Sequence, residues 1–300
     1  MVKLIKELPI PISGLALSLA AMGNLLRPYG EWIRYSLGSL SLLIVAMLII
    51  KIISNPKCLE QGFGNPVVAG VMATFPMTLM ILSTYLAPLN TVVAQGVYFL
   101  GLGIHVYLIV VFTTKYLFNF DIKNVFPTHF IVYVGIVCAS VAAPAHGMQI
   151  LGQYLFWFGL ISYLALLPVV IYRVVKEKVD ADPAKPTMAI FLAPPSLCLA
   201  GYFSSFATRY TLITNILGVF IIASLVLVLL YMIRIRSIEF YPSYSAFTFP
   251  FVISAIATKP LNIWILSPII TFLAIVSVTF VLLSYIRFLA NLTSQEVLQN

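Results

Sequence analysis

The chain has 300 residues, of which 61% are hydrophobic and 9% are charged, and its mean hydropathy is +1.05. A soluble globular protein carries charge on about a quarter of its residues, so this composition excludes that class and indicates an integral membrane protein. Since about 20 apolar residues cross a bilayer, the chain has room for roughly ten spans and for no separate extramembrane domain. The net charge of +8 is therefore interpreted first as a signal of membrane topology rather than of nucleic-acid binding.

Apolar runs separated by charged or turn-forming residues predict an all-α protein with a single transmembrane domain over residues 1–300. In chain order, the predicted membrane-spanning helices are 11–26, 35–53, 67–86, 91–116, 128–142, 150–174, 187–203, 211–235, 243–258 and 262–289. The first of these follows Lys3 and Lys6, as the apolar part of a signal peptide would. Asn24, Arg27 and Pro28 come next in place of a small-residue cleavage site, so we expect a retained first helix.

The basic residues are divided unequally between the two sides of these predicted helices. If the N-terminus is cytoplasmic, the outer side receives four, which are Arg27, Arg34, Arg209 and Lys259. The inner side receives Lys3, Lys6, Lys51, Lys57, Lys115, Lys123, Arg173, Lys176, Lys178, Lys185, Arg234, Arg236 and Arg287. This positive-inside asymmetry predicts that both termini are cytoplasmic. Trp32 and Trp264 then fall near the outer interface, where indole rings are favoured.

Small and helix-disturbing residues are concentrated in the odd-numbered predicted helices, whereas most even-numbered ones are longer and richer in Leu, Ile and Val. Examples are Gly14 and Ser18 in the first helix, Thr74 and Pro76 in the third, Gly135 and Ser140 in the fifth, Pro194, Pro195 and Ser196 in the seventh, and Thr248 and Pro250 in the ninth. A proline inside a helix kinks it, and small residues let helices pack closely or leave open space. The alternation predicts five helical hairpins, with five bent helices around a central pore. The alternative is that Gly and Pro are simply frequent in membrane helices, which explains the residues but not their alternation.

Ionisable groups at membrane depth, which membrane enzymes and proton-coupled carriers need, are almost absent. Every Asp and Glu maps to a connection or a terminus, and no phosphate loop, metal-ligand spacing or nucleophile with its base is present. We therefore expect no enzyme, no cofactor and no metal, and we expect no nucleic-acid partner. Cys58, Cys138 and Cys198 are interpreted as free thiols.

His105 is the one ionisable side chain predicted clearly at mid-membrane depth. It is the candidate proton acceptor if the protein is a coupled carrier, although a lone histidine among apolar neighbours more often is neutral and hydrogen-bonded. The lack of carboxylates along the odd helices also favours anions over cations. A pore lined by hydroxyls and interrupted backbone offers hydrogen-bond donors to an anion and no ring of negative charge to a cation.

Five segments of the odd helices resemble one known family in their residues, order and spacing. They are PISGLALSLAAMGN at 11–24, NPVVAGVMATFP at 65–76, FPTHFIVYVG at 126–135, TMAIFLAPPSLCLAGY at 187–202 and SAFTFPF at 245–251. In these segments the chain resembles the tellurite-resistance and dicarboxylate transporter (TDT) family. That family includes bacterial TehA, fungal malate and sulfite transporters and the plant guard-cell slow anion channel.

The resemblance implies ten helices in five hairpins, a central pore formed by the odd helices, and a homotrimer with one pore in each subunit. It also implies that an aromatic residue on the ninth helix occludes the pore, and Phe249, before Pro250, matches that position. A phenyl ring across a narrow passage strips an ion of water and offers no ligand in return. The candidate pore-lining residues are Gly14, Ser18, Thr74, Ser140, Ser196 and Thr248.

Three functions are compatible with these observations. The first is a channel for small anions in the cytoplasmic membrane of a bacterium, with Phe249 as its constriction. The second is a secondary transporter, proton-coupled through His105, for a dicarboxylate such as malate or for sulfite or tellurite. The third is a structural or sensory subunit whose small-residue helices pack against a partner. The missing mid-membrane carboxylates favour the first over the second.

Overall fold

The computed structural model describes residues 5, 7–177, 181–235, 238–261 and 265–297, and within these ranges the chain forms helices and turns but no strand. Lys3, Lys6, Lys178, Arg236 and Trp264, to which the sequence assigned a side of the membrane, lie outside the described residues. Every predicted segment contains helix, although the helices begin and end elsewhere in several places. The second predicted segment, for example, begins at Glu31 rather than at residue 35.

Five long helices alternate with five segments that are short or interrupted. The long helices are α3 (Glu31–Ser54), α7 (Thr91–Phe112, continued by the π-helical turn η2, Thr113–Leu117), α10 (Gln149–Lys176), α12 (Thr211–Arg234) and α14 (Leu266–Val297). The other segments are α2 (Ile12–Leu26), α5 (Pro66–Met72) with α6 (Thr74–Leu86), α8 (His129–Tyr133) with α9 (Val137–Ala142), η5 (Asp182–Leu192) with α11 (Ala193–Ser205), and η6 (Pro242–Phe247) with α13 (Thr248–Thr258). Short connecting turns are η1 (Arg27–Tyr29), α4 (Lys57–Phe63), η3 (Ile122–Asn124), η4 (Ala143–His146) and η7 (Lys259–Leu261).

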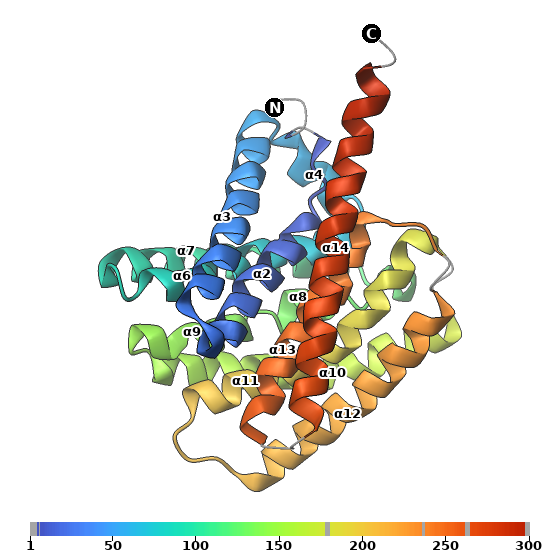
Figure 1. Ribbon diagram of the computed structural model, residues 1–300. Helices are drawn as coiled ribbons and strands as arrows, with labels where there is room; N and C mark the ends of the chain where they lie inside the picture. The colour runs from blue at the N-terminus through green and yellow to red at the C-terminus, as the bar shows by residue number, and fades with distance from the viewer. Residues whose placement is uncertain (1–4, 6, 178–180, 236–237, 262–264, 298–300) are drawn as a thin grey trace.

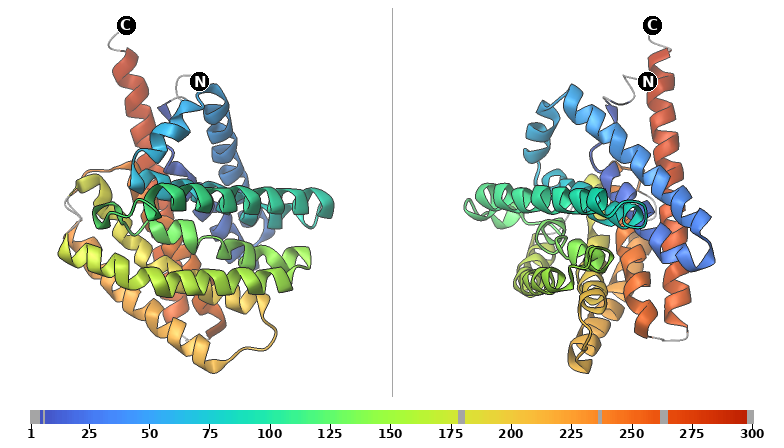
Figure 2. Two further views of the ribbon diagram at one scale, coloured as in Figure 1. Left: turned by 180° about the vertical axis from the view of Figure 1, so that it is seen from behind. Right: turned by 90° about the vertical axis from the view of Figure 1, so that its left-hand side faces the viewer.

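The interrupted segments pack into a closed ring. Helix α2 packs against α6 and α13, α6 packs against α9, and α11 packs against both α9 and α13. Each long helix lies outside this ring against the segment that precedes it in the chain. Helices α3 and α14 cover one side, and α7, α10 and α12 cover the other, as Figure 1 and Figure 2 show from opposite directions.

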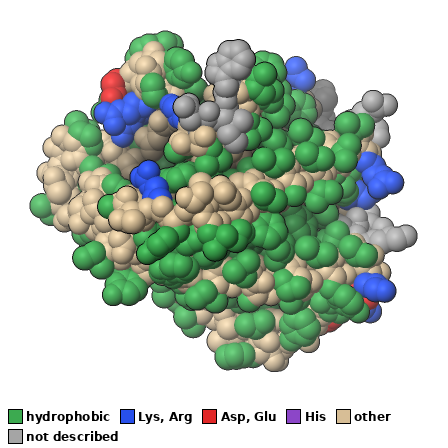
Figure 3. Space-filling view, turned by 90° about the horizontal axis from the view of Figure 1, so that it is seen from below, with side chains coloured by type: hydrophobic (Ala, Val, Ile, Leu, Met, Phe, Trp, Pro, Cys, Tyr) green, Lys and Arg blue, Asp and Glu red, His purple; other side chains and the backbone are tan. Residues whose placement is uncertain are grey.

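Burial separates the two sets of helices. Seven helical stretches are long and apolar enough to cross a membrane, namely the five long ones, Pro66–Leu86 and Asp182–Ser205. In Pro66–Leu86 and Asp182–Ser205, 78% of the most apolar 18-residue stretch is buried. In the five long helices, 22–33% of the corresponding stretch is buried. The long helices therefore present apolar side chains to the bilayer, and Figure 3 shows one such face, where hydrophobic side chains dominate and charged ones lie toward the edges.

Proline explains most of the interruptions in the inner segments; the break at residues 134–136, between α8 and α9, contains none. The sequence predicted kinks at Pro76, Pro194, Pro195 and Pro250, and in the structure each of these residues lies in the first turn of an α-helix that follows a break or a 3-10 helix. A proline has no N–H for the carbonyl four residues earlier, and its ring clashes with that carbonyl. For Pro76 that carbonyl belongs to Met72, the last residue of α5. The helix accordingly ends and restarts instead of bending.

Close packing of α6 on α7 requires a glycine. A Cβ atom at Gly101 would lie 2.9 Å from the Pro76 carbonyl oxygen and 3.1 Å from the Leu79 Cβ atom. At Gly103, two residues further along the same helix, no atom lies within 4 Å of the position that a Cβ would take. Only the first glycine is therefore needed for this contact.

We expect Gly101→Ala to lower the free energy of unfolding by about 1–3 kcal/mol, because the added methyl group overpacks a backbone contact. Gly103→Ala is the matched control and should be neutral or stabilising by up to about 1 kcal/mol, since alanine is the better helix former. Thermal unfolding of the detergent-solubilised wild type and variants measures both changes in the free energy of unfolding. Equal stabilities would contradict the proposed contact.

Candidate functional site

A small cavity lies at the centre of the ring. Its volume is about 40 Å³, which is room for about three water molecules. All five inner segments contribute to its wall. The residues that line it are Pro11, Gly14, Val71, Thr74, Met77, Phe130, Ile131, Val134, Gly135, Ile190, Ala193, Pro194, Leu197, Ser243, Ser245, Ala246, Phe249 and Pro250. We call it the central cavity.

Two larger cavities flank the central one. The first, the Arg173 vestibule, has a volume of about 680 Å³ and is lined by Arg173, Lys123, Asn65 and Asn124 among others. It shares Pro11, Val71 and Ser243 with the central cavity. The second, the Arg34 vestibule, has a volume of about 450 Å³ and is lined by residues that include Arg27, Arg34, Asn24 and Lys259. The three cavities thus form a series through the ring.

Phe249 separates the central cavity from the Arg34 vestibule. It is the only described residue that lines both of them, and only 7% of its surface is exposed. It lies in the first turn of α13, which starts immediately after the 3-10 helix η6. Phe247 and Phe251 instead line an apolar groove that α13 shares with α12 and α14. Helix α13 therefore directs one phenyl ring to the axis of the ring and two away from it.

The charged residues that line the cavities are of one sign. No Asp or Glu is among the described residues that line the central cavity or either vestibule. Arg173 is buried, its guanidinium lies 5.2 Å from the centre of the Phe126 ring, and its Nη2 donates to the Lys123 carbonyl oxygen (3.4 Å). Arg34 is buried at the other vestibule. Both vestibules therefore attract anions and repel cations.

Side-chain hydrogen bonds that involve hydroxyl groups cross the joints of the ring. The pairs are Ser13 with Thr74 between α2 and α6 (2.7 Å), Ser18 with Thr248 between α2 and α13 (2.6 Å), Ser196 with Ser254 between α11 and α13 (2.7 Å), Ser140 with Ser205 between α9 and α11 (3.0 Å), and Ser83 with His146 Nε2 between α6 and η4, the turn that follows α9 (2.8 Å). Every joint of the ring thus carries at least one polar pair.

The candidate pore-lining residues fall into two groups. Gly14 and Thr74 line the central cavity, as do Pro194 and Pro250. The other four hydroxyl residues, Ser18, Ser140, Ser196 and Thr248, are buried in the interhelical pairs and line none of the three cavities. Of the remaining prolines, Pro76 and Pro195 are buried but also lie away from the cavities.

Ser243 is a candidate residue that the sequence analysis missed. Its buried Oγ has no hydrogen-bond partner among the described residues, and it lines both the central cavity and the Arg173 vestibule. The other two hydroxyls of the central cavity already have partners, since Thr74 donates to Val71 and Ser245 pairs with Tyr285. The sequence signal was its position directly after Pro242, at the start of an interrupted helix.

His105 lies between α7 and α8 and lines none of the three cavities. It is fully buried, and its Nε2 lies 2.9 Å from the Val132 carbonyl oxygen. Because a carbonyl only accepts, Nε2 carries the proton, and the Nδ1 atom is left without a partner among the described residues. The three cysteines are free and buried, and the described residues contain no cluster of side chains that would hold a metal ion.

Comparison with known proteins finds one match that covers nearly the whole chain. The sequence profile of the voltage-dependent anion channel family (SLAC1) matches residues 8–293. No curated protein matches the chain.

A double-mutant cycle tests whether the hydroxyl pairs hold the ring together. Ser196→Ala and Ser254→Ala should each destabilise the protein, and their coupling energy should be about 0.6 kcal/mol, the average for a hydrogen bond between membrane helices. Ser36→Ala, at an exposed position of α3, is the control and should change nothing. Unfolding in mixed micelles measures the free energy of unfolding of the wild type, the two single variants and the double variant. Strictly additive single effects would show that the pair contributes no interaction energy.

Proposed function

Because this chain belongs to the voltage-dependent anion channel family, we propose that it conducts small inorganic anions through the three cavities and that Phe249 closes the passage. The observation that carries the proposal is that Phe249, alone among the described residues, lines both the central cavity and the Arg34 vestibule. A phenyl ring there presents no hydrogen-bond donor to an anion that has shed its water. The barrier to conduction in the closed passage is then the free energy needed to remove water from the anion.

The sign of the permeating ion follows from the lining. Basic side chains lie at both vestibules, and no carboxylate lies along the described walls. Ser243 offers a buried hydroxyl donor at the boundary of the central cavity. An anion therefore meets attraction at each end and a donor inside, whereas a cation meets no ligand of opposite charge.

The size of the central cavity favours small inorganic anions over dicarboxylates. A volume of about 40 Å³ suits an ion with the bulk of a few water molecules. The vestibules, of about 680 and 450 Å³, would admit larger ions, which would then stop at the central cavity. We accordingly propose that chloride and nitrate pass and that malate does not.

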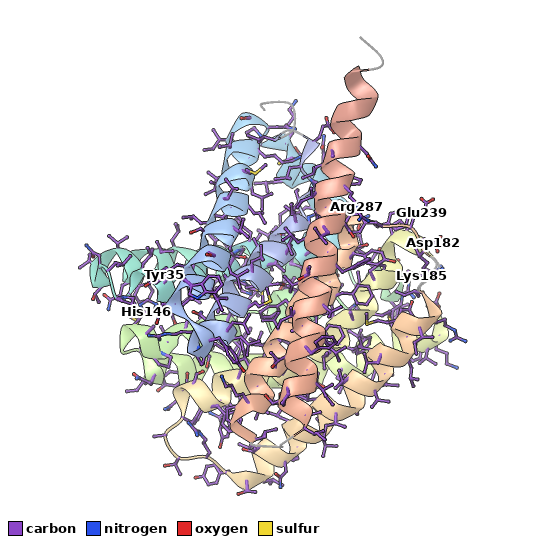
Figure 4. All side chains as sticks on the ribbon, viewed as in Figure 1. Tyr35, His146, Asp182, Lys185, Glu239 and Arg287 are labelled. Atoms are coloured by element: carbon purple, nitrogen blue, oxygen red, sulfur yellow. The ribbon has the colours of Figure 1, made fainter. Side chains whose placement is uncertain are left out.

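We further propose that the ten helical segments all cross the membrane, as five hairpins around this passage, with the Arg173 vestibule on the cytoplasmic side. Lys185 and Arg287, which the charge asymmetry assigns to the cytoplasm, lie on one side of the molecule, and Tyr35 and His146 lie on the other (Figure 4). The resemblance to the TDT family supports a homotrimer in the cytoplasmic membrane of a bacterium, with one passage in each copy. The exposed apolar faces of the long helices would then contact lipid and neighbouring copies.

Flux through the purified protein in proteoliposomes tests the role of Phe249. Under an imposed membrane potential and without a proton gradient, chloride and nitrate flux should be low in the wild type. It should rise by about tenfold or more in Phe249→Ala, which corresponds to a barrier lowered by at least about 1.4 kcal/mol. Phe251→Ala is the matched control, since this ring is also buried and lies on the same helix but lines the groove and none of the three cavities.

Three results would contradict the proposal. Equal flux in Phe249→Ala and Phe251→Ala would show that Phe249 only packs. Malate uptake that requires a proton gradient, acidifies the vesicle lumen and is lost in His105→Ala would instead identify a proton-coupled carrier. A complete lack of anion flux in wild type and variants alike would favour a structural or sensory subunit.

A further inference from the structure

We infer that the Arg34 vestibule is a binding station for small oxyanions, and that the carboxylate of Glu31, which bonds to two arginines of its lining, competes with them. The inference rests on the proposed conduction of anions, because it names where an arriving ion first binds. It also goes beyond that proposal, because it makes an acidic side chain of the chain itself the competitor.

Arg34 is held in place by its neighbours. Its Nε donates to Asn24 Oδ1 (3.0 Å), and its Nη2 donates to the Thr84 carbonyl oxygen (2.9 Å). Its guanidinium also lies 4.5 Å from the centre of the Tyr85 ring. These contacts come from α2 and α6, so an arginine from the outer helix α3 is fixed against the inner ring. Only 4% of this side chain is exposed, and the vestibule is the cavity that it lines.

The carboxylate of Glu31 shows how an anion would be bound there. Its Oε1 accepts from Arg27 Nε (2.7 Å), and its Oε2 lies 3.5 Å from Arg34 Nη1. One carboxylate therefore spans two guanidinium groups, both of which line the vestibule. Each guanidinium contacts a different oxygen of the carboxylate, and an oxyanion with several oxygens can bridge the two in the same way, so the geometry suits nitrate better than a spherical halide.

The competing carboxylate is easily displaced. Half of the Glu31 side chain and 58% of the Arg27 side chain are exposed, and exposed ion pairs contribute little because water screens them. Lys259 also lines the vestibule and directly follows the C-terminal end of α13, the helix whose first turn carries Phe249. An oxyanion that replaces the carboxylate thus enters a cavity that is lined by three cationic side chains. Phe249 closes the inner end of this cavity.

Binding can be measured without any permeation. The probe is sodium nitrate, titrated at constant ionic strength against sodium gluconate, and the readout is the nitrate-dependent rise in the unfolding temperature of the full chain in nanodiscs. Wild type should give a saturable rise. Glu31→Gln should lower the half-saturating nitrate concentration by about threefold, because the competitor is removed. Lys259→Gln should raise that concentration by about threefold, because one attracting charge is lost.

Arg209→Gln is the matched control. Arg209 is a basic residue that the charge asymmetry assigns to the same side of the membrane, but it does not line the vestibule. It donates instead to the carbonyl oxygens of Phe203 and Phe206. Its half-saturating concentration should stay within about 1.5-fold of wild type, because a distant exposed charge is screened. Arg34→Lys keeps the positive charge but loses the hydrogen bonds of the fixed guanidinium. It should raise the half-saturating concentration of nitrate by about fivefold and leave that of chloride, titrated in the same way, nearly unchanged.

The outcomes separate this inference from the proposed function. If nitrate does not stabilise the wild type in a saturable way, or if Glu31→Gln behaves like Arg209→Gln, the binding station is refuted, even when Phe249→Ala conducts. If the pattern of half-saturating concentrations is as expected but Phe249→Ala conducts no anion, the station stands and the channel is refuted. Should Arg34→Lys fail to fold, Glu31→Gln and Lys259→Gln still decide the matter.

Discussion

The inner ring depends on one constraint, which is that polar groups inside a bilayer must bond to the protein because no water reaches them. Several of its helices are interrupted at prolines, and a proline leaves the carbonyl four residues earlier without its usual partner. Serine hydroxyls of the ring bond within their own helices: Ser254 donates to the Pro250 carbonyl oxygen and Ser196 to the Leu192 carbonyl oxygen. The same two hydroxyls meet across the joint between α11 and α13. Hydroxyls that are bonded within each helix thus also hold the ring closed.

A ring closed in this way has few polar groups left for its lumen. The central cavity is consequently mostly apolar, and the charge that attracts ions must come from elsewhere in the chain. Arg34 comes from α3 and Arg173 from α10, two long helices that otherwise face lipid, while Arg27, Lys123 and Lys259 come from connecting turns. The inner segments set the width of the passage, and the outer helices and turns set its electrostatic potential.

The sequence predicted the alternation of short and long segments well, because hydropathy and proline content are local properties. It also predicted the sign of the ion, because Asp and Glu are confined to the connections. It did not predict which hydroxyls face a cavity, since Ser18 and Thr248 are indistinguishable from Thr74 by residue type, and only packing decides between a joint and a lumen. Arg34 was assigned to a side of the membrane, but its burial against Asn24 and Thr84 depends on contacts between helices distant in sequence. The C-terminal ends of α12 and α13 followed the prediction closely. Helix α14, in contrast, extends to Val297, eight residues beyond the predicted end at residue 289.

In the proposed channel, the position of Phe249 explains how a rigid ring of helices could still control flux. Three of the described residues line both the central cavity and the Arg173 vestibule, whereas a single phenyl ring lines both the central cavity and the Arg34 vestibule. Phe247 and Phe251 pack into the groove that α13 shares with α12 and α14, so the helix is anchored on its outer side. Rotation of a single side chain would then open the passage without separating any hydroxyl pair. Since the rate of crossing depends exponentially on barrier height, a barrier concentrated at one phenyl ring gives a small local movement a large effect on flux.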